Sequence, residues 1–117
     1  VVYSQNKDKL INVTYKIKGE FTVSDTVKVI GNDAFNGQDK MKNIILKKGI
    51  ERIESSAFWD CTELESIDIP NSIIEIQGLV FGGNTLNLKE INIHKPINSV
   101  EGAPWGASKG MKIINWN

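Results

Sequence analysis

The sequence predicts a repeat solenoid, a fold in which short similar units coil and stack, and three regularities support that prediction. Aromatic residues recur every 23 or 24 positions, at Phe35, Phe58, Phe81 and Trp105. Apolar residues stand five and eight positions before each aromatic, and a phrase of the form L-x-x-I-x-I begins six or seven positions after it. Because one such unit is too small to bury its own apolar residues, neighbouring units must stack to form a core.

The repeated positions are almost all apolar across four units. The pairs that precede the aromatic are Val27 and Ile30, Ile50 and Ile53, Ile73 and Ile76, and Ile97 and Val100. The phrases that follow it are Met41–Ile44–Leu46, Leu64–Ile67–Ile69, Leu88–Ile91–Ile93 and Met111–Ile114–Trp116. The residues directly before the aromatics are Ala34, Ala57, Val80 and Pro104, and Pro104 is the one exception among the repeated positions. The pattern far exceeds what a 40% apolar chain would give by chance. The units run over about 27–49, 50–72, 73–96 and 97–117, within one domain overall.

Each part of the unit predicts a local structure. The last two apolar positions of the L-x-x-I-x-I phrase alternate with a period of two, which is typical of a short strand with one buried face. The apolar pair that follows turns the chain and buries two more side chains. Polar residues such as Asp33 and Ser55 then lead into a compact bend or short helical turn that ends on the aromatic. Their side chains suit that entry because they can accept hydrogen bonds from free backbone N–H groups.

Residues 1–26 are less regular than the rest of the chain. The run Leu10–Tyr15 resembles a strand phrase and would give a fifth rung, yet twelve residues separate its end from Val27 where later units use four. We expect instead two strands, Val13–Ile17 and Glu20–Val23, that cap the first unit.

Composition excludes several classes of function. The 14 basic and 14 acidic residues cancel, so the chain offers no electrostatic case for binding nucleic acid or anionic lipid. No apolar run approaches the ~20 residues that a membrane-spanning helix needs, so we expect no membrane insertion. The chain begins with Val1 rather than Met, and we expect that an upstream segment has been removed. A cleaved secretory signal and the trimming of a longer chain both remain open.

The sequence offers no set of residues for catalysis or metal binding. His94 is the only histidine, and alternation after the buried Ile93 sends it to an exposed face without the further ligands that a metal needs. The lone Cys61 cannot form an intrachain disulfide, and its place in the repeat favours packing over reactivity. No phosphate-binding loop or nucleophile motif occurs. We therefore predict no enzyme, no cofactor and no metal site.

The unit resembles the BspA-like, or treponemal-type, leucine-rich repeat, which reads approximately C-x-x-L-x-x-I-x-L-P-x-x-L/V-x-x-I-G-x-x-A-F. The segment Cys61–Pro70 matches this pattern position by position, and Ile30–Gly31 and Ala34–Phe35 fill the I-G and A-F positions. Cys occurs in one unit only, and Pro104–Trp105 replaces Ala-Phe in the last unit, which we expect to be a terminal cap. The resemblance implies a right-handed β/α superhelix, rich in short strands and joined by short helical turns.

The resemblance also implies where a ligand would bind. In leucine-rich repeats the residues beside the buried strand positions form an exposed sheet that usually carries the ligand. The candidate contact residues on this face are Ile45, Ser66, Asp68, Glu90, Asn92, His94, Ile113 and Asn115. Trp59 is a further candidate because it has no aromatic counterpart in the other units. The alternative is that Trp59 packs under a neighbouring loop, and the sequence leaves the two equally open.

Members of this family are mostly secreted or surface proteins of bacteria and some parasitic protists, implicated in adhesion to host matrix proteins or other cells. We therefore predict a non-enzymatic binding module of a secreted or cell-surface protein, with a protein or glycan ligand on the exposed sheet. The alternative is a structural spacer or assembly repeat in a larger envelope protein, with no ligand of its own.

Overall fold

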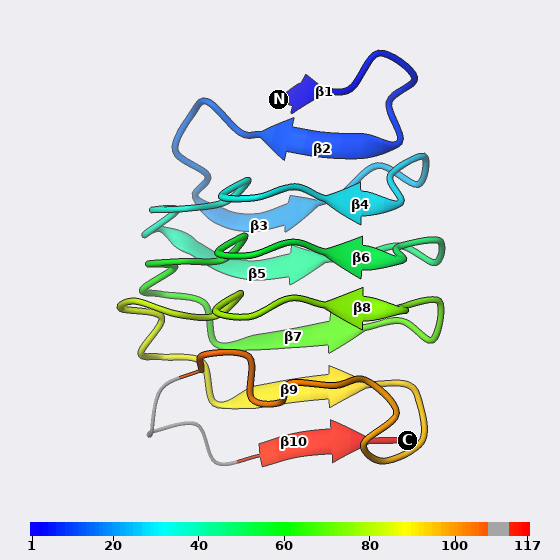
Figure 1. Ribbon diagram of the computed structural model, residues 1–117. Helices are drawn as coiled ribbons and strands as arrows, with labels where there is room; N and C mark the ends of the chain where they lie inside the picture. Colours follow the sequence, from blue (N-terminus) through cyan, green and yellow to red (C-terminus); the bar gives the residue numbers. More distant parts are fainter. Residues whose placement is uncertain (108–112) are drawn as a thin grey trace.

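The chain coils into an elongated β-solenoid of about four turns, which the computed structural model describes over residues 1–107 and 113–117 (Figure 1). The strands of successive turns stack into two sheets of five strands each. Sheet A contains β1 (Val2–Tyr3), β2 (Lys9–Asn12), β4 (Val29–Ile30), β6 (Arg52–Ile53) and β8 (Glu75–Ile76), in that order. Sheet B contains β3 (Gly19–Thr22), β5 (Met41–Ile45), β7 (Ser66–Ile69), β9 (Glu90–Ile93) and β10 (Ile113–Trp116), also stacked in that order.

Four strands of sheet B, β5, β7, β9 and β10, coincide with the predicted L-x-x-I-x-I phrases and stack in the predicted register. In β7 the apolar Ile67 and Ile69 are buried, whereas Asp68 between them is exposed. Ile67 pairs with Ile91 of β9, so equivalent positions of successive units lie side by side in a parallel sheet. The predicted repeat solenoid is confirmed.

The predicted helical turns are wrong, and with them the β/α superhelix, because the described residues contain no helix. The segment around each aromatic holds residues of left-handed backbone conformation, for example Ser56 with a φ of 60° and Asp60 with a φ of 57°. Such residues interrupt helical winding, which needs negative φ at every position. The N–H of Phe58 bonds to the next turn, to the carbonyl of Val80 at 2.9 Å, whereas those of Ala57 and Trp59 bond to carbonyls three residues back within the same turn.

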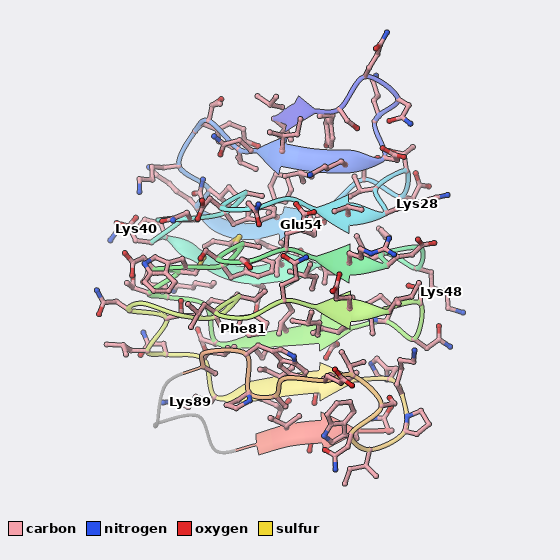
Figure 2. The ribbon with its side chains drawn as sticks, in the orientation of Figure 1. Lys28, Lys40, Lys48, Glu54, Phe81 and Lys89 are labelled. Atoms are coloured by element: carbon pink, nitrogen blue, oxygen red, sulfur yellow. The ribbon has the colours of Figure 1, made fainter. Side chains whose placement is uncertain are left out.

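A ladder of aromatic rings fills the space between the two sheets. The ring of Phe58 stacks between those of Phe35 and Phe81, with centroid distances of 5.3 and 5.7 Å and nearly parallel planes. Phe21 of β3 meets Phe35 edge-on at 5.5 Å. Figure 2 shows Phe81 inside the coil, whereas labelled lysines such as Lys40 and Lys89 extend from its turns. Stacking of equivalent residues therefore gives the solenoid one continuous core.

The first 26 residues differ from the two predicted capping strands. β2 pairs in parallel with β4 and β3 pairs in parallel with β5, so both extend the stacked sheets, and β1 pairs antiparallel with β2. The predicted strand Val13–Ile17 is wrong, since this segment lies outside any strand. Its backbone bonds to a side chain of the next turn: Gln38 accepts from the N–H of Ile17 and donates to the carbonyl of Tyr15, each at 2.9 Å. The predicted strand at Glu20–Val23 corresponds to β3.

The last turn departs from the repeat on the side of sheet A. Ile97 occupies a position that is buried in the three units before it, yet its side chain is 74% exposed. Pro96 lacks a backbone N–H, and Asn98 has a φ of 59°, so the chain leaves the path of the earlier turns. Sheet A accordingly ends at β8, one turn before sheet B. Met111 and the side chain of Ile113 lie outside the described residues.

Candidate binding face

The outer face of sheet B, which we call the binding face, carries the predicted contact residues in rows across the strands. One row joins Ser66 and Glu90, which are register partners, and continues to the backbone position of Ile113. The next row joins Ile45, Asp68, Asn92 and Asn115. The third row contains His94, whose Nδ1 lies 2.8 Å from the side-chain oxygen of Asn117. Stacking of equivalent strand positions thus brings together the rows that the repeat predicts.

Hydrogen bonds join the polar side chains of the second row. The amide of Asn115 donates to Asn92 at 2.7 Å, and the amide of Asn92 donates to the carboxylate of Asp68 at 2.7 Å. The same Asn92 amide donates to Glu90 at 2.9 Å. Because the amide of Asn92 accepts from Asn115 and donates to Asp68 and Glu90, this part of the binding face has a defined arrangement of donors and acceptors.

The other half of the binding face is hollowed. A first hollow of about 270 Å³ is lined by Glu20 of β3, by Asn43, Ile44 and Ile45 of β5 with the following Leu46, and by Ser66 and Asp68 of β7. A second, of about 470 Å³, lies on the other side of Ser66. Its lining residues are Lys42, Glu63, Glu65, Ser66, Asn87, Lys89 and Glu90.

The hollows have a local cause in the sequence. Ser66 carries a small side chain in a row where its neighbours Asn43 and Glu90 are larger. In addition, β5 and β7 pair at one position only, Ile45 with Asp68, whereas β7 and β9 pair at four consecutive positions. A small side chain at a loosely paired junction leaves room above the sheet.

The binding face is acidic. The two hollows together are lined by five carboxylates and two ammonium groups, which gives a net charge of −3. Four of the predicted contact residues line them, namely Ile45, Ser66, Asp68 and Glu90. Sequence analysis missed Glu20 because β3 was not recognised as a rung. It also missed the column Lys42–Glu65–Lys89, although these residues share the first variable position of the strand phrase in three units.

Trp59 belongs to a turn and lines neither hollow. Its side chain is half-buried, and its indole lies against Gly82 and Gly83 of the next turn. A Cβ atom on Gly82 would come within 2.4 Å of Cζ3 of the indole, so the ring occupies the space that a larger residue would need. This packing corresponds to the second of the two alternatives for Trp59.

Cys61, the one cysteine of the sequence, lies in the core. Burial raises the pKa of the Cys61 thiol to about 12, because the charged thiolate would lose its hydration. Residues 1–107 and 113–117 contain no group of three or more His, Cys, Asp or Glu side chains placed to hold a metal ion. A hollow of about 670 Å³, larger than the two on the binding face, lies where sheet A ends, between β8 and Ser99–Gly102, and is lined by none of the predicted contact residues. No helix in the described ranges is long and apolar enough to cross a bilayer.

Comparisons with known proteins agree with this architecture. Among solved structures, the chain is similar to the crystal structure of the pneumococcal vaccine antigen PcpA, with a TM-score of 0.76 and 25% sequence identity. The similarity covers 97% of this chain and 34% of the PcpA chain, so the present sequence spans about a third of that antigen. A comparison with curated proteins finds no match. The family model for the BspA type leucine rich repeat region matches residues 13–114 in six copies. The chain therefore belongs to the BspA-type leucine-rich-repeat family.

Proposed function

We propose that this chain is a non-enzymatic binding module of a secreted or cell-surface protein, and that it holds a protein or glycan ligand on the binding face. The observation that carries the proposal is the pair of adjoining hollows beside a hydrogen-bonded row of amides and carboxylates on a stacked scaffold. Concave sites with a few oriented polar groups are typical of ligand-binding surfaces. Membership of the family and similarity to a pneumococcal vaccine antigen support the location.

A binding role accounts for the face better than catalysis does. Catalysis requires a nucleophile or acid–base group held beside a partner that activates it. The ring of His94 is exposed and bonds to Asn117, while Cys61 is buried in the core. The side chains that line the hollows offer charge, hydrogen bonds and one apolar contact, which are the means of recognition.

The test is a binding screen of the folded chain against immobilised host matrix proteins and a glycan array. A face variant combines Asp68→Lys, Glu90→Lys and His94→Ala, which change exposed or half-buried side chains and leave the core intact. We expect it to lose binding by tenfold or more, because two attractive contacts become repulsive.

A matched control variant carries the same chemical changes away from the binding face. It combines Asp25→Lys, Glu101→Lys and Asn71→Ala, at three exposed turn positions. It should bind like the parent chain. Equal binding by the parent and the face variant would show that the ligand uses another surface. A screen without any ligand would instead favour the role of a structural spacer in a larger envelope protein.

A further inference from the structure

The first hollow has an apolar floor in an otherwise polar row. Ile45 is 39% exposed, and its register partners on the neighbouring strands are Thr22 and Asp68. When the apolar part of a ligand covers an exposed aliphatic side chain, apolar surface is removed from water, and this contributes favourably to the free energy of binding. The hollow over Ile45 is small, about 270 Å³, which suits one extended side chain better than a ring system with its substituents.

Carboxylates stand on both sides of this floor, and neither forms an ion pair with a residue that the structure describes. Glu20 comes from β3 and Asp68 from β7, on either side of Ile45 in β5. Among the described residues, none of the ion pairs includes Glu20 or Asp68; the pairs are Lys9–Glu54, Lys16–Asp39 and Arg52–Glu75. The hydrogen bond that Asp68 accepts comes from the neutral amide of Asn92. Both negative charges are therefore uncompensated at the rim of the hollow.

We propose that this hollow binds a lysine or arginine side chain of a polypeptide ligand. The aliphatic stem covers Ile45, and the cationic head lies between Glu20 and Asp68. Lysine and arginine combine an apolar stem with a charged end, so they match a floor and a rim of this kind. The inference rests on the proposed function of the binding face and specifies the chemistry of the partner.

The second hollow also favours positive charge, in the part of the ligand that lies beyond the first hollow. It adjoins the first at Ser66 and presents three carboxylates against the ammonium groups of Lys42 and Lys89. A segment that crosses the strands over Ser66 meets a net charge of −3 over both hollows. A basic peptide compensates this charge, a neutral glycan leaves it unpaired, and a sulfated glycan is repelled by it. Charge complementarity therefore favours a basic polypeptide.

The experiment is a titration of the ¹⁵N-labelled chain, followed by NMR, with three acetylated and amidated pentapeptides of the form Gly-X-Gly-X-Gly. X is arginine, its neutral near-isostere citrulline, or norleucine, which keeps only the apolar stem. We expect the arginine peptide to shift backbone amides of β3, β5 and β7, and to bind at least tenfold more tightly than the citrulline peptide. Its Kd should rise as the salt concentration is raised, because the contacts with the rim are charged.

Variants of the protein assign the site. Glu20→Gln combined with Asp68→Asn should raise the Kd of the arginine peptide by about tenfold, since each exposed charge contact changes binding by roughly two- to fivefold. Ile45→Ser should weaken the arginine and norleucine peptides alike. Asp25→Asn, which removes one exposed negative charge away from the binding face, should leave the Kd unchanged.

The possible failures separate the two proposals. Equal affinity for arginine and citrulline peptides, or shifts confined to other strands, would overturn the assignment of a basic side chain and leave the binding face available for another ligand. Failure of the proposed function would be seen instead in the screen of matrix proteins and glycans. There the face variant would bind every natural ligand as tightly as the parent chain does.

Discussion

The hydroxyl of Thr85 donates a hydrogen bond to the carbonyl oxygen of Phe58 one turn earlier in the solenoid, with 2.7 Å between the two oxygens. Cys61 occupies the same repeat position one turn before, and its thiol donates to the carbonyl of Phe35 at 3.2 Å. Gln38 holds this position in the preceding turn and donates to the carbonyl of Tyr15. Three different residues at one buried position thus share the ability to donate a hydrogen bond to the turn before. This position therefore suits a small or medium-sized side chain that can donate a hydrogen bond to the preceding turn inside the coil.

Thr85→Val is expected to lower the free energy of unfolding by about 1–3 kcal/mol, because it keeps the shape and removes the hydroxyl. The hydroxyl oxygen also accepts from the buried N–H of Cys61 at 3.2 Å, and that N–H would lose its partner. Unfolding in urea measures the change. Thr62→Val, at a partly exposed position, should change stability by less than about 0.5 kcal/mol. Equal effects of the two substitutions would contradict the role assigned to the hydroxyl of Thr85.

Cys61 is expected to be unreactive in the folded chain. Burial raises the pKa of its thiol from 9.0 to about 12, so at pH 8 the folded protein contains almost no thiolate, which is the form that reacts. A disulfide reagent such as DTNB should modify the thiol in urea and leave the native protein unmodified over the same time.

The same pKa shift predicts how stability depends on pH. The thiol titrates near pH 9 when unfolded and near 12 when folded, so its contribution is complete below pH 9 and declines as the pH rises from 9 towards 12. Cys61→Ala serves as the reference, because it lacks the thiol and keeps every other ionisable group. The parent chain should lose more stability than Cys61→Ala between pH 8 and pH 10.5. An identical loss in both chains would rule out the contribution of the thiol.

Phe58→Ala is expected to cost about 3–5 kcal/mol of folding stability, which is typical when a buried aromatic ring is removed from a close-packed core. Phe58 stacks on Phe35 and Phe81 at once, so the cavity would open in the middle of the ladder. Thermal or urea unfolding provides the measurement. Leu86→Ala removes an exposed side chain and should have little effect. An unchanged melt of Phe58→Ala would mean that the repeat register is incorrect.

Ile73 and Ile97 occupy the same repeat position and should respond differently to truncation. Ile73 is fully buried and Ile97 is 74% exposed. Ile73→Ala is expected to cost about 2–5 kcal/mol, and Ile97→Ala less than about 0.5 kcal/mol. The comparison uses the same urea unfolding experiment. A large loss from Ile97→Ala would show that the last turn closes onto sheet A in solution.

We expect that the packing of Trp59 requires a glycine at position 82. Gly82→Ala would place a methyl group within 2.4 Å of the indole, and we expect it to cost about 1–3 kcal/mol through overpacking. In a Trp59→Ala background the same change should be nearly neutral. The double-mutant cycle therefore measures the coupling of the two residues, and strictly additive effects would contradict the contact.

Much of this protein could be predicted from the spacing of its apolar residues. Positions that recur every 23 residues must lie on one line of a coil, so the rows of the binding face follow once Ile67 and Ile69 are recognised as a strand with one buried face. The row Ile45–Asp68–Asn92–Asn115 and the ladder of Phe35, Phe58 and Phe81 follow from the same regularity, because equivalent residues of identical turns lie beside one another.

Other features depend on contacts that the repeat does not contain. The bends at Ser56 and Asp60 are left-handed rather than helical because the N–H groups of Phe58 and Asp60 bond to carbonyls of the next turn, which only the stacked structure makes available. Residues 9–22 form a rung despite irregular spacing because the side chain of Gln38 holds the backbone between its two strands.

The sequence by itself determined the coil, its period and the outward rows, since these follow from which residues must be kept away from water. Only the tertiary structure decided that Glu20 joins Asp68 beside Ile45, that Ile97 is left exposed, and that Trp59 lies on Gly82. Each of these features depends on how one turn packs against the next. The role of each residue comes from a neighbour that is distant along the chain, and its residue type alone does not reveal it.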